Sequence, residues 1–272
     1  LPAGNCTSFV YNDAANVTHI YKKIAPGEPN DANDPNVIAV IYTYDPNFVN
    51  KVKTIRDPNG NITTFEYDSK GNVKKITYPA VDGQTPAIRY TYNQYGQVET
   101  VTAPDGIITK YIYYTGQTSD PNYGKLWKVV VDANEADPNR LEITTEYRYD
   151  IVGNVIEIKD PNGDVTKLEY GKLDQLTKTT SPLNYVTNFT YNKNRKLSKL
   201  EKVKTGGSQI TRYSYDKLDH LKAVTDPLNN VTTFGYNKNE DPNLVKDAEN
   251  NKTVKQYDER GLLAKVTDAN GG

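Results

Sequence analysis

The chain has 272 residues, of which 36% are hydrophobic, and its 34 acidic side chains almost balance 33 basic ones to give a net charge of −1. This balance does not support a nucleic-acid partner, which would require a basic face, and no stretch of the sequence is long and apolar enough to span a membrane. Cys6 is the only cysteine, so no internal disulfide is expected.

A tyrosine, usually followed by aspartate or asparagine, returns about every 21 residues along the whole chain. A regular period of this size indicates a repeat architecture, in which one unit buries its apolar face only by stacking on its neighbours. These anchor tyrosines are Tyr11, Tyr44, Tyr67, Tyr92, Tyr113, Tyr149, Tyr170, Tyr191, Tyr215, Tyr236 and Tyr257.

A turn is predicted directly after each anchor tyrosine. Glycine reaches the left-handed conformation that a bulged hairpin turn needs, and it stands four residues after the anchor at Gly71, Gly96, Gly153 and Gly261. Other side chains replace this glycine elsewhere, so those turns must be more strained or differently built. The replacements are Asp174, Arg195, Asp219 and Glu240.

An apolar strand follows the turn, with a step of three between its apolar positions, as from Val155 to Ile158. Strict alternation would give a step of two, so we expect a bulge at this point or apolar side chains on both faces. The same step separates Val73 from Ile76, and Val98 from Val101.

A second turn comes next. In Asp57-Pro58-Asn59-Gly60, aspartate caps the turn, proline presets φ and glycine closes it, as in a type I turn. Pro161 and Pro227 hold the same place in later repeats.

A returning strand completes the repeat and is its clearest signal. Thr166, Leu168 and Tyr170 alternate with Lys167 and Glu169, which is typical of a half-buried strand. In the equivalent ladder of the last repeat, Lys255 replaces the central aromatic or leucine. Each repeat is therefore predicted to be one β-hairpin, and the fold an all-β antiparallel ribbon of tandem hairpins. We expect residues 1–272 to form a single array of about ten repeats, with loop insertions near 22–38, 78–87, 115–124 and 132–140. Because the chain begins without methionine and stops within a repeat, we also expect it to be an excerpt of a longer product.

Two acidic segments place oxygen ligands at alternate positions, as calcium loops do. They contain Asp31, Asn33 and Asp34 in one and Asp132, Asn134 and Asp137 in the other. Both lack the glycine and bidentate glutamate of an EF-hand, so the favoured interpretation is a polar hairpin insertion rich in turn formers, with calcium binding as the alternative. His19 and His220 lie in different repeats without a nucleophile motif beside them, so we predict neither a catalytic nor a cofactor-binding residue.

The pattern Tyr-Asp-x-x-Gly, Asp-Pro-x-Gly and Thr-x-aromatic-x-Tyr resembles the YD-repeat, or RHS-repeat, family over essentially the whole chain. The resemblance implies a β-ribbon that spirals into a shell, tube or barrel. Family members include toxin-complex shells, bacterial wall-associated proteins and teneurins, so it also implies an extracellular or cell-surface location.

The leading hypothesis is a structural protein, not an enzyme, that forms part of a shell, tube or filament and pairs with further repeats or with copies of itself. An adhesive or carbohydrate-binding module that uses exposed tyrosines is the alternative. A segment of a toxin-encapsulating shell and a glycan-cleaving enzyme with a carboxylate pair are further alternatives.

Overall fold

The computed structural model describes residues 6–23, 27, 29–34, 37–116 and 119–269, and within them the chain forms 22 β-strands and no helix. It divides into two compact units. Unit 1 comprises residues 1–115 and 124–145, and unit 2 comprises residues 116–123 and 146–272. No helix of the described residues could cross a membrane.

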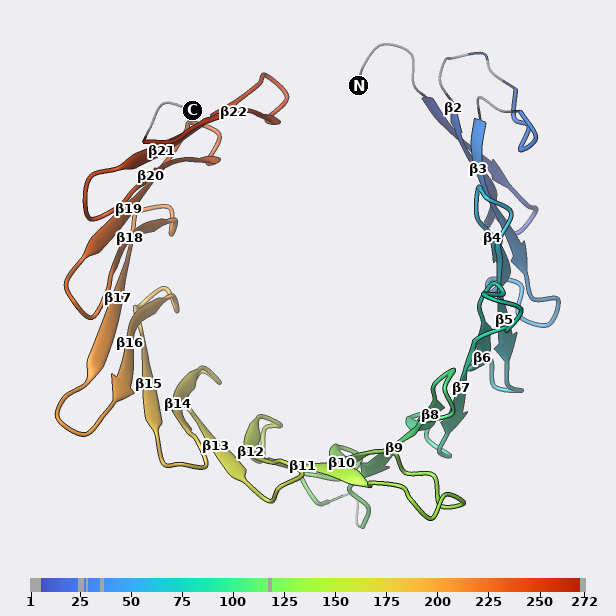
Figure 1. The fold of residues 1–272 in the computed structure, drawn as a ribbon, viewed down its shortest axis with the longest axis horizontal. Helices are drawn as coiled ribbons and strands as arrows, with labels where there is room; N and C mark the ends of the chain where they lie inside the picture. Colours follow the sequence, from blue (N-terminus) through green and yellow to red (C-terminus); the bar gives the residue numbers. More distant parts are fainter. Residues whose placement is uncertain (1–5, 24–26, 28, 35–36, 117–118, 270–272) are drawn as a thin grey trace. The chain divides into compact units, whose positions relative to one another are not determined.

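Unit 1 is an antiparallel sheet whose strands pair in chain order, so successive hairpins lie side by side (Figure 1). Its strands are β1 (Cys6–Tyr11), β2 (Val17–Lys23), β3 (Val37–Tyr44), β4 (Val52–Arg56), β5 (Ile62–Tyr67), β6 (Val73–Thr77), β7 (Ala87–Tyr92), β8 (Val98–Thr102), β9 (Ile108–Tyr113) and β10 (Leu126–Val131).

Unit 2 repeats this arrangement from the end of β11 onward, again as an antiparallel meander. Its strands are the second part of β11 (Ile143–Tyr149), whose first three residues belong to unit 1, and then β12 (Val155–Lys159), β13 (Val165–Tyr170), β14 (Leu176–Thr180), β15 (Val186–Tyr191), β16 (Leu197–Val203), β17 (Gln209–Tyr215), β18 (Leu221–Thr225), β19 (Val231–Tyr236), β20 (Pro242–Lys246), β21 (Lys252–Tyr257) and β22 (Leu263–Thr267). The predicted all-β ribbon of tandem hairpins is therefore confirmed.

The predicted bulge is also confirmed. On the β11–β12 pair, Tyr147 faces Ile158 whereas Tyr149 faces Val155, so a step of two on one strand opposes a step of three on the other. The extra residue lets both apolar positions of β12 share the face that carries the tyrosines. The same shift recurs beside other anchors, including Tyr67, Tyr170 and Tyr215.

Turns without glycine are strained and not differently built. Gly153 has a φ of 108°, and Asp174, Arg195, Asp219 and Glu240 adopt φ values of 55°, 62°, 64° and 68° at the equivalent place. A side chain with a Cβ atom is disfavoured there. The turn geometry therefore dominates the local preference of these four residues.

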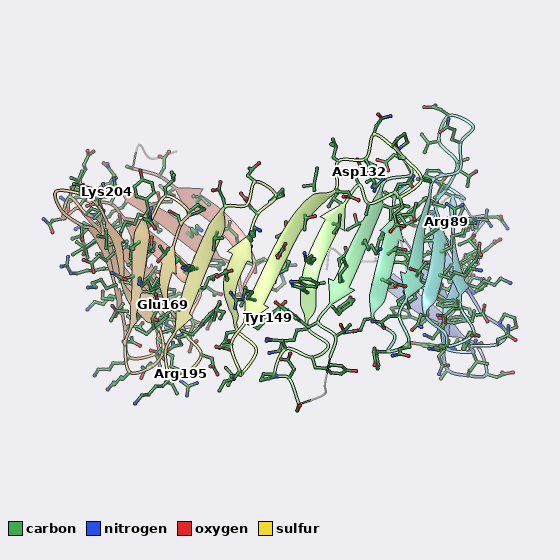
Figure 2. All side chains as sticks on the ribbon, turned by 90° about the horizontal axis from the view of Figure 1, so that it is seen from below. Arg89, Asp132, Tyr149, Glu169, Arg195 and Lys204 are labelled. Atoms are coloured by element: carbon green, nitrogen blue, oxygen red, sulfur yellow. The ribbon has the colours of Figure 1, made fainter. Side chains whose placement is uncertain are left out.

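The hydrophobic core is thin. Among the described residues, five apolar side chains are buried: Tyr21, Val37, Ala39, Ala87 and Ala133. Side chains project from both faces of the sheet, and no second layer covers either face in the described parts of each unit (Figure 2). Apolar burial is therefore shared among many half-buried positions along the strands.

The longest connections between strands span residues 24–36, 78–86, 114–125 and 132–142, whereas most others have five residues. Parts of the first and third connections lie outside the described residues. Successive connections alternate between the two ends of the strands. In unit 2, Arg195 and Lys204 lie in connections at opposite ends of the strands (Figure 2).

Candidate functional site: the contacts between successive repeats

Eight anchor tyrosines join the two strands of a hairpin through their hydroxyl groups, at the end where the neighbouring repeats meet. We call this set of hydrogen bonds the tyrosine ladder. In it, hydroxyl groups donate to backbone carbonyl oxygens over 2.6–3.1 Å. The donor and acceptor pairs are Tyr44 with Val17, Tyr67 with Val52, Tyr92 with Val73, Tyr113 with Val98, Tyr191 with Leu176, Tyr215 with Leu197, Tyr236 with Leu221, and Tyr257 with Pro242.

Each of these acceptors is the first residue of a strand. For Tyr67, the last backbone pair between β4 and β5 on that side joins Thr54 to Thr64, two residues beyond Val52. The hydroxyl therefore extends the hydrogen bonding of the hairpin past its backbone ladder. Burial of the ring, together with the nearby charge of Asp45, raises the pKa of Tyr67 above its usual value. Every anchor ring from Tyr44 to Tyr257 is half-buried, including those of Tyr149 and Tyr170.

Aspartate–asparagine pairs brace the five-residue turns. Oδ1 of Asp68 accepts hydrogen bonds from the backbone N–H groups of Lys70 and Asn72, and Oδ2 accepts one of 2.9 Å from the Asn72 side chain. These bonds, that of Asn72 above all, lower the pKa of Asp68. The same causes lower the pKa values of Asp57, Asp226 and Asp247.

The predicted turn residues occupy these braced turns. Gly71, Gly96, Gly153 and Gly261 all have positive φ, between 75° and 108°. Pro58, Pro161 and Pro227 follow the aspartates Asp57, Asp160 and Asp226, whose carbonyl groups accept the hydrogen bonds that close the second turns. The closing donors are Gly60, Gly163 and Asn229, at 3.0, 3.0 and 3.1 Å.

Polar side chains also link several anchor turns to the next one. In unit 2, the residues five positions after Tyr149 and Tyr170 reach the residue four positions after the following anchor. Asn154 donates to Asp174 over 3.1 Å, and Gln175 donates to the carbonyl of Arg195 over 3.1 Å. In unit 1, Lys51 donates to the carbonyl of Gly71. The link to Asp174 gives a physical reason for a strained carboxylate where glycine would be relaxed.

A more highly charged version of this link lies between the turns at 216–220 and 237–241. His220 Nδ1 is 3.2 Å from Asp216 Oδ2, and its Nε2 is 3.3 Å from Glu240 Oε2. The ring stacks on Tyr236 with 4.6 Å between centroids. Sequence reasoning treated His220 as inert. The signal that could have identified it is the polar residue that recurs five positions after the anchors, as at Asn154 and Gln175.

The calcium candidates use their oxygens within their own loops. Asp31 accepts hydrogen bonds from the backbone and side chain of Asn33, and Asp132 accepts one from the backbone N–H of Leu141. Asn134 and Asp137 accept bonds from the N–H groups two residues further on. Asp34 lies in the same short loop as Asp31, and its carbonyl accepts a bond from Val37. No three His, Cys, Asp or Glu side chains in the described segments gather as metal ligands. Calcium binding stays a prediction.

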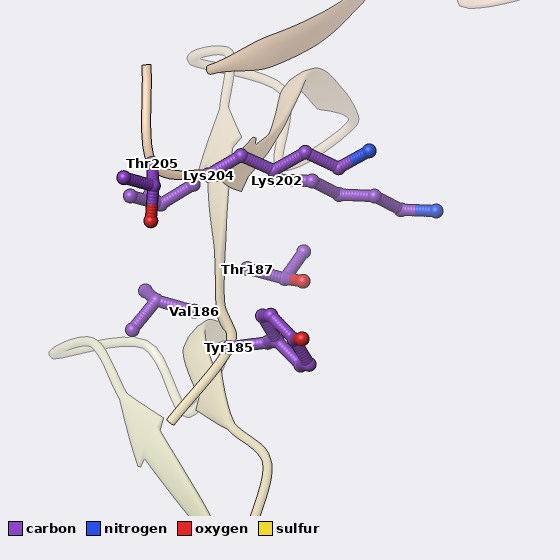
Figure 3. Close-up of a pocket in the computed structure, with 7 residues that line it drawn as sticks. Tyr185, Val186, Thr187, Lys202, Lys204 and Thr205 are labelled. Carbon is purple, nitrogen blue, oxygen red and sulfur yellow. The ribbon is translucent and has the colours of Figure 1, made fainter. Parts of the chain in front are cut away.

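A pocket of about 390 Å³ opens at the end of the β15–β16 hairpin. The Tyr185 ring is 63% exposed beside it, and the ammonium groups of Lys202 and Lys204 extend to the same side of the hairpin (Figure 3). The lining consists of Tyr185, Val186, Thr187, Lys202, Val203, Lys204 and Thr205.

Two segments of the chain, residues 49–80 and 149–186, match the RHS repeat family. The chain therefore contains RHS repeats. No curated protein matches the chain significantly.

The fold is similar to parts of much larger solved structures. The crystal structure of TcdB2-TccC3-TEV aligns with a TM-score of 0.72 at 13% identity, covering 98% of this chain and 15% of that one. The crystal structure of TcdB2-TccC3-Cdc42 aligns at 0.60 and 16% identity, covering 97% and 17%. The Photorhabdus luminescens Tc holotoxin pore aligns at 0.58 and 15% identity, covering 93% and 16%. The chain thus spans about one sixth of the length of these proteins, and the likeness concerns the fold.

Proposed function

We propose that this RHS-repeat chain is a structural segment of the wall of a shell or tube, located outside the cell or at its surface. The tyrosine ladder carries this proposal. The same hydrogen bond recurs within one hairpin after another, so each added repeat extends the ribbon with the same geometry. The similarity to the fold of TcdB2-TccC3 proteins supports the same function.

Further repeats, or the repeats of a second copy, are the proposed partners. The outer strand β22 carries Leu263 and Val266, which are 53% and 44% exposed. The equivalent Val155 and Ile158 of β12 are half-buried between neighbouring hairpins. An exposed strand with apolar side chains is a template for pairing with another strand.

Negative-stain electron microscopy of the purified chain over a range of concentrations tests this proposal. We expect tubes, filaments or end-to-end pairs that increase with concentration. A matched variant, Leu263→Lys with Val266→Lys, places charges on β22 and should reduce this association. Particles of one small size at every concentration would contradict self-association as the way the wall is built.

A carbohydrate-binding function is the second candidate, because an exposed aromatic ring beside two lysines suits stacking on an acidic sugar. The anchor rings from Tyr44 to Tyr257 are half-buried and most of their hydroxyl groups donate to backbone carbonyls, so the observation that favours sugar binding is the exposed Tyr185 beside its two lysines. A glycan array tests it with Tyr185→Ala as the variant and Tyr95→Ala, which alters an exposed ring of unit 1, as the control. Binding that Tyr185→Ala removes and Tyr95→Ala preserves would support the function, and no binding to any acidic sugar would contradict it.

A further inference from the structure

The contacts of His220 require a proton on each ring nitrogen to be satisfied at once. Both nitrogens lie within 3.3 Å of a carboxylate oxygen, one from Asp216 and one from Glu240. A neutral imidazole carries a single N–H, so it can donate to one of these carboxylates while its other nitrogen turns a lone pair toward the second. The imidazolium donates to both.

The surroundings hold the ring in this position. Asp216 also accepts a 3.0 Å hydrogen bond from the backbone N–H of His220, which fixes the turn beneath the ring. On the other side, the hydroxyl of Tyr236 is bound to the carbonyl of Leu221, so the ring on which His220 stacks is itself anchored. The His220 side chain is 19% exposed, whereas Glu240 is 62% exposed.

Other charged groups near this contact have partners of their own. Asp219, in the same turn as His220, accepts a 2.8 Å hydrogen bond from Asn194, which lies in the preceding anchor turn at 192–196. In the turn at 237–241, Asp241 accepts a hydrogen bond of 3.0 Å from the Asn237 side chain, and Lys238 lies in the same exposed turn. On β17, burial raises the pKa of Tyr215, so this residue is neutral near pH 7. The charged groups in direct contact with the imidazole are thus the two carboxylates.

We infer that His220 is a pH-dependent link between two consecutive repeats, in which protonation of the imidazole tightens the contact of the turn at 216–220 with the turn at 237–241. An imidazole ordinarily gains its proton between pH 8 and 5, whereas carboxylates stay ionised until the pH approaches about 4. Mild acidification therefore adds a charge-assisted hydrogen bond across the repeats without removing its acceptors.

The chain holds a natural comparison for this link. Asn154 occupies the same place in an earlier repeat, and its amide nitrogen lies 3.0 Å from Asp150 Oδ2 and 3.1 Å from Asp174 Oδ1. One amide nitrogen supplies both protons and does not titrate in this range. The Asn154 link should therefore be insensitive to pH where the His220 link is sensitive.

Amide hydrogen exchange of the whole chain at pH 5.5 and pH 8.0, corrected for intrinsic exchange rates, tests the inference. The reporters are the N–H groups of Glu240 and Asp241, which bond to Asn237 within the second turn. We expect their protection to be about two- to fivefold greater at pH 5.5, the size of one partly exposed charged contact. The difference should shrink at high salt because exposed charges are screened.

His220→Asn is the matched variant, because it recreates the arrangement of Asn154, and it should remove the difference between the two pH values. The inference is overturned if the unmodified chain shows no such difference or if His220→Asn retains it. If the His220→Asn variant loses protection at both pH values, the same exchange measurement is made on the variant Asn154→His. New pH-dependent protection at residues 171–175 would support the inference, and its absence would overturn it.

Discussion

The hydroxyl group of Tyr67 donates a 2.6 Å hydrogen bond to the carbonyl oxygen of Val52, fifteen residues earlier in the chain. Val52 in turn faces Tyr44, the anchor of the preceding repeat. The first residue of a strand therefore faces one anchor tyrosine, and its carbonyl accepts the hydrogen bond from the next anchor tyrosine. Together the two contacts connect three successive strands, β3, β4 and β5, in a sheet with few buried side chains among the described residues.

Tyr67→Phe removes the hydroxyl and preserves the ring, so it should weaken β4 and β5 locally by about 1 kcal/mol, the net value of a typical hydrogen bond. Hydrogen exchange in these two strands measures the loss. Tyr185→Phe is the control, because that ring is 63% exposed and the change should be close to neutral. Equal losses in the two variants would show that the tyrosine ladder contributes nothing specific.

Gly71→Ala should destabilise the protein more than Gly96→Ala. Both glycines have a φ near 80°, so each alanine carries a backbone penalty of about 1–2 kcal/mol. A Cβ atom at Gly96 would meet open space, whereas one at Gly71 would lie 3.1 Å from the Phe48 ring and from the Lys51 side chain. Urea unfolding of the two variants measures the difference, and equal midpoints would argue against a steric requirement at Gly71.

Stability should fall as the pH drops below about 4. The Asn partner and backbone N–H groups lower the pKa values of Asp57, Asp68, Asp226 and Asp247 in the folded chain. A carboxyl group with a lowered folded pKa stabilises the fold above its unfolded pKa, and this contribution is lost as the pH falls toward the folded value.

Unfolding at a series of pH values between 6 and 2.5 measures this loss, and Asp68→Asn should reduce it. The turn at 93–97 is an internal control for hydrogen exchange, because Asn93 and Gln97 form the same brace without a carboxylate. Acid-dependent opening of that turn to the same extent as the turn at 68–72 would contradict the prediction.

Exposed ion pairs between neighbouring strands should contribute little to stability. Lys178 and Glu169 approach to 2.8 Å, but their side chains are 37% and 58% exposed. Solvent screening limits such a pair to about 0.5 kcal/mol. Glu169→Gln should therefore change the unfolding free energy by no more than this amount, and the change should vanish in 0.5 M salt. A larger loss would show that the pair is coupled to the inter-repeat contacts.

The repeat, its two turns, the bulge and the alternating strands were predictable from residue order. Each depends on interactions within one hairpin. Glycine at Gly153, proline at Pro161 and the step from Val155 to Ile158 specify local dihedral angles and the face on which each side chain lies. Because every repeat carries the same local signals, the antiparallel ribbon also followed from the sequence.

The contacts between hairpins were decided by the tertiary structure. The pairing of Asn154 with Asp174 and of His220 with Glu240 depends on how far one hairpin is offset from the next, and no local preference specifies that offset. The same contacts show why Asp174 and Glu240 tolerate a positive φ, which their own preferences oppose. The division into two units also arose only in three dimensions, since the same repeat motif runs through both.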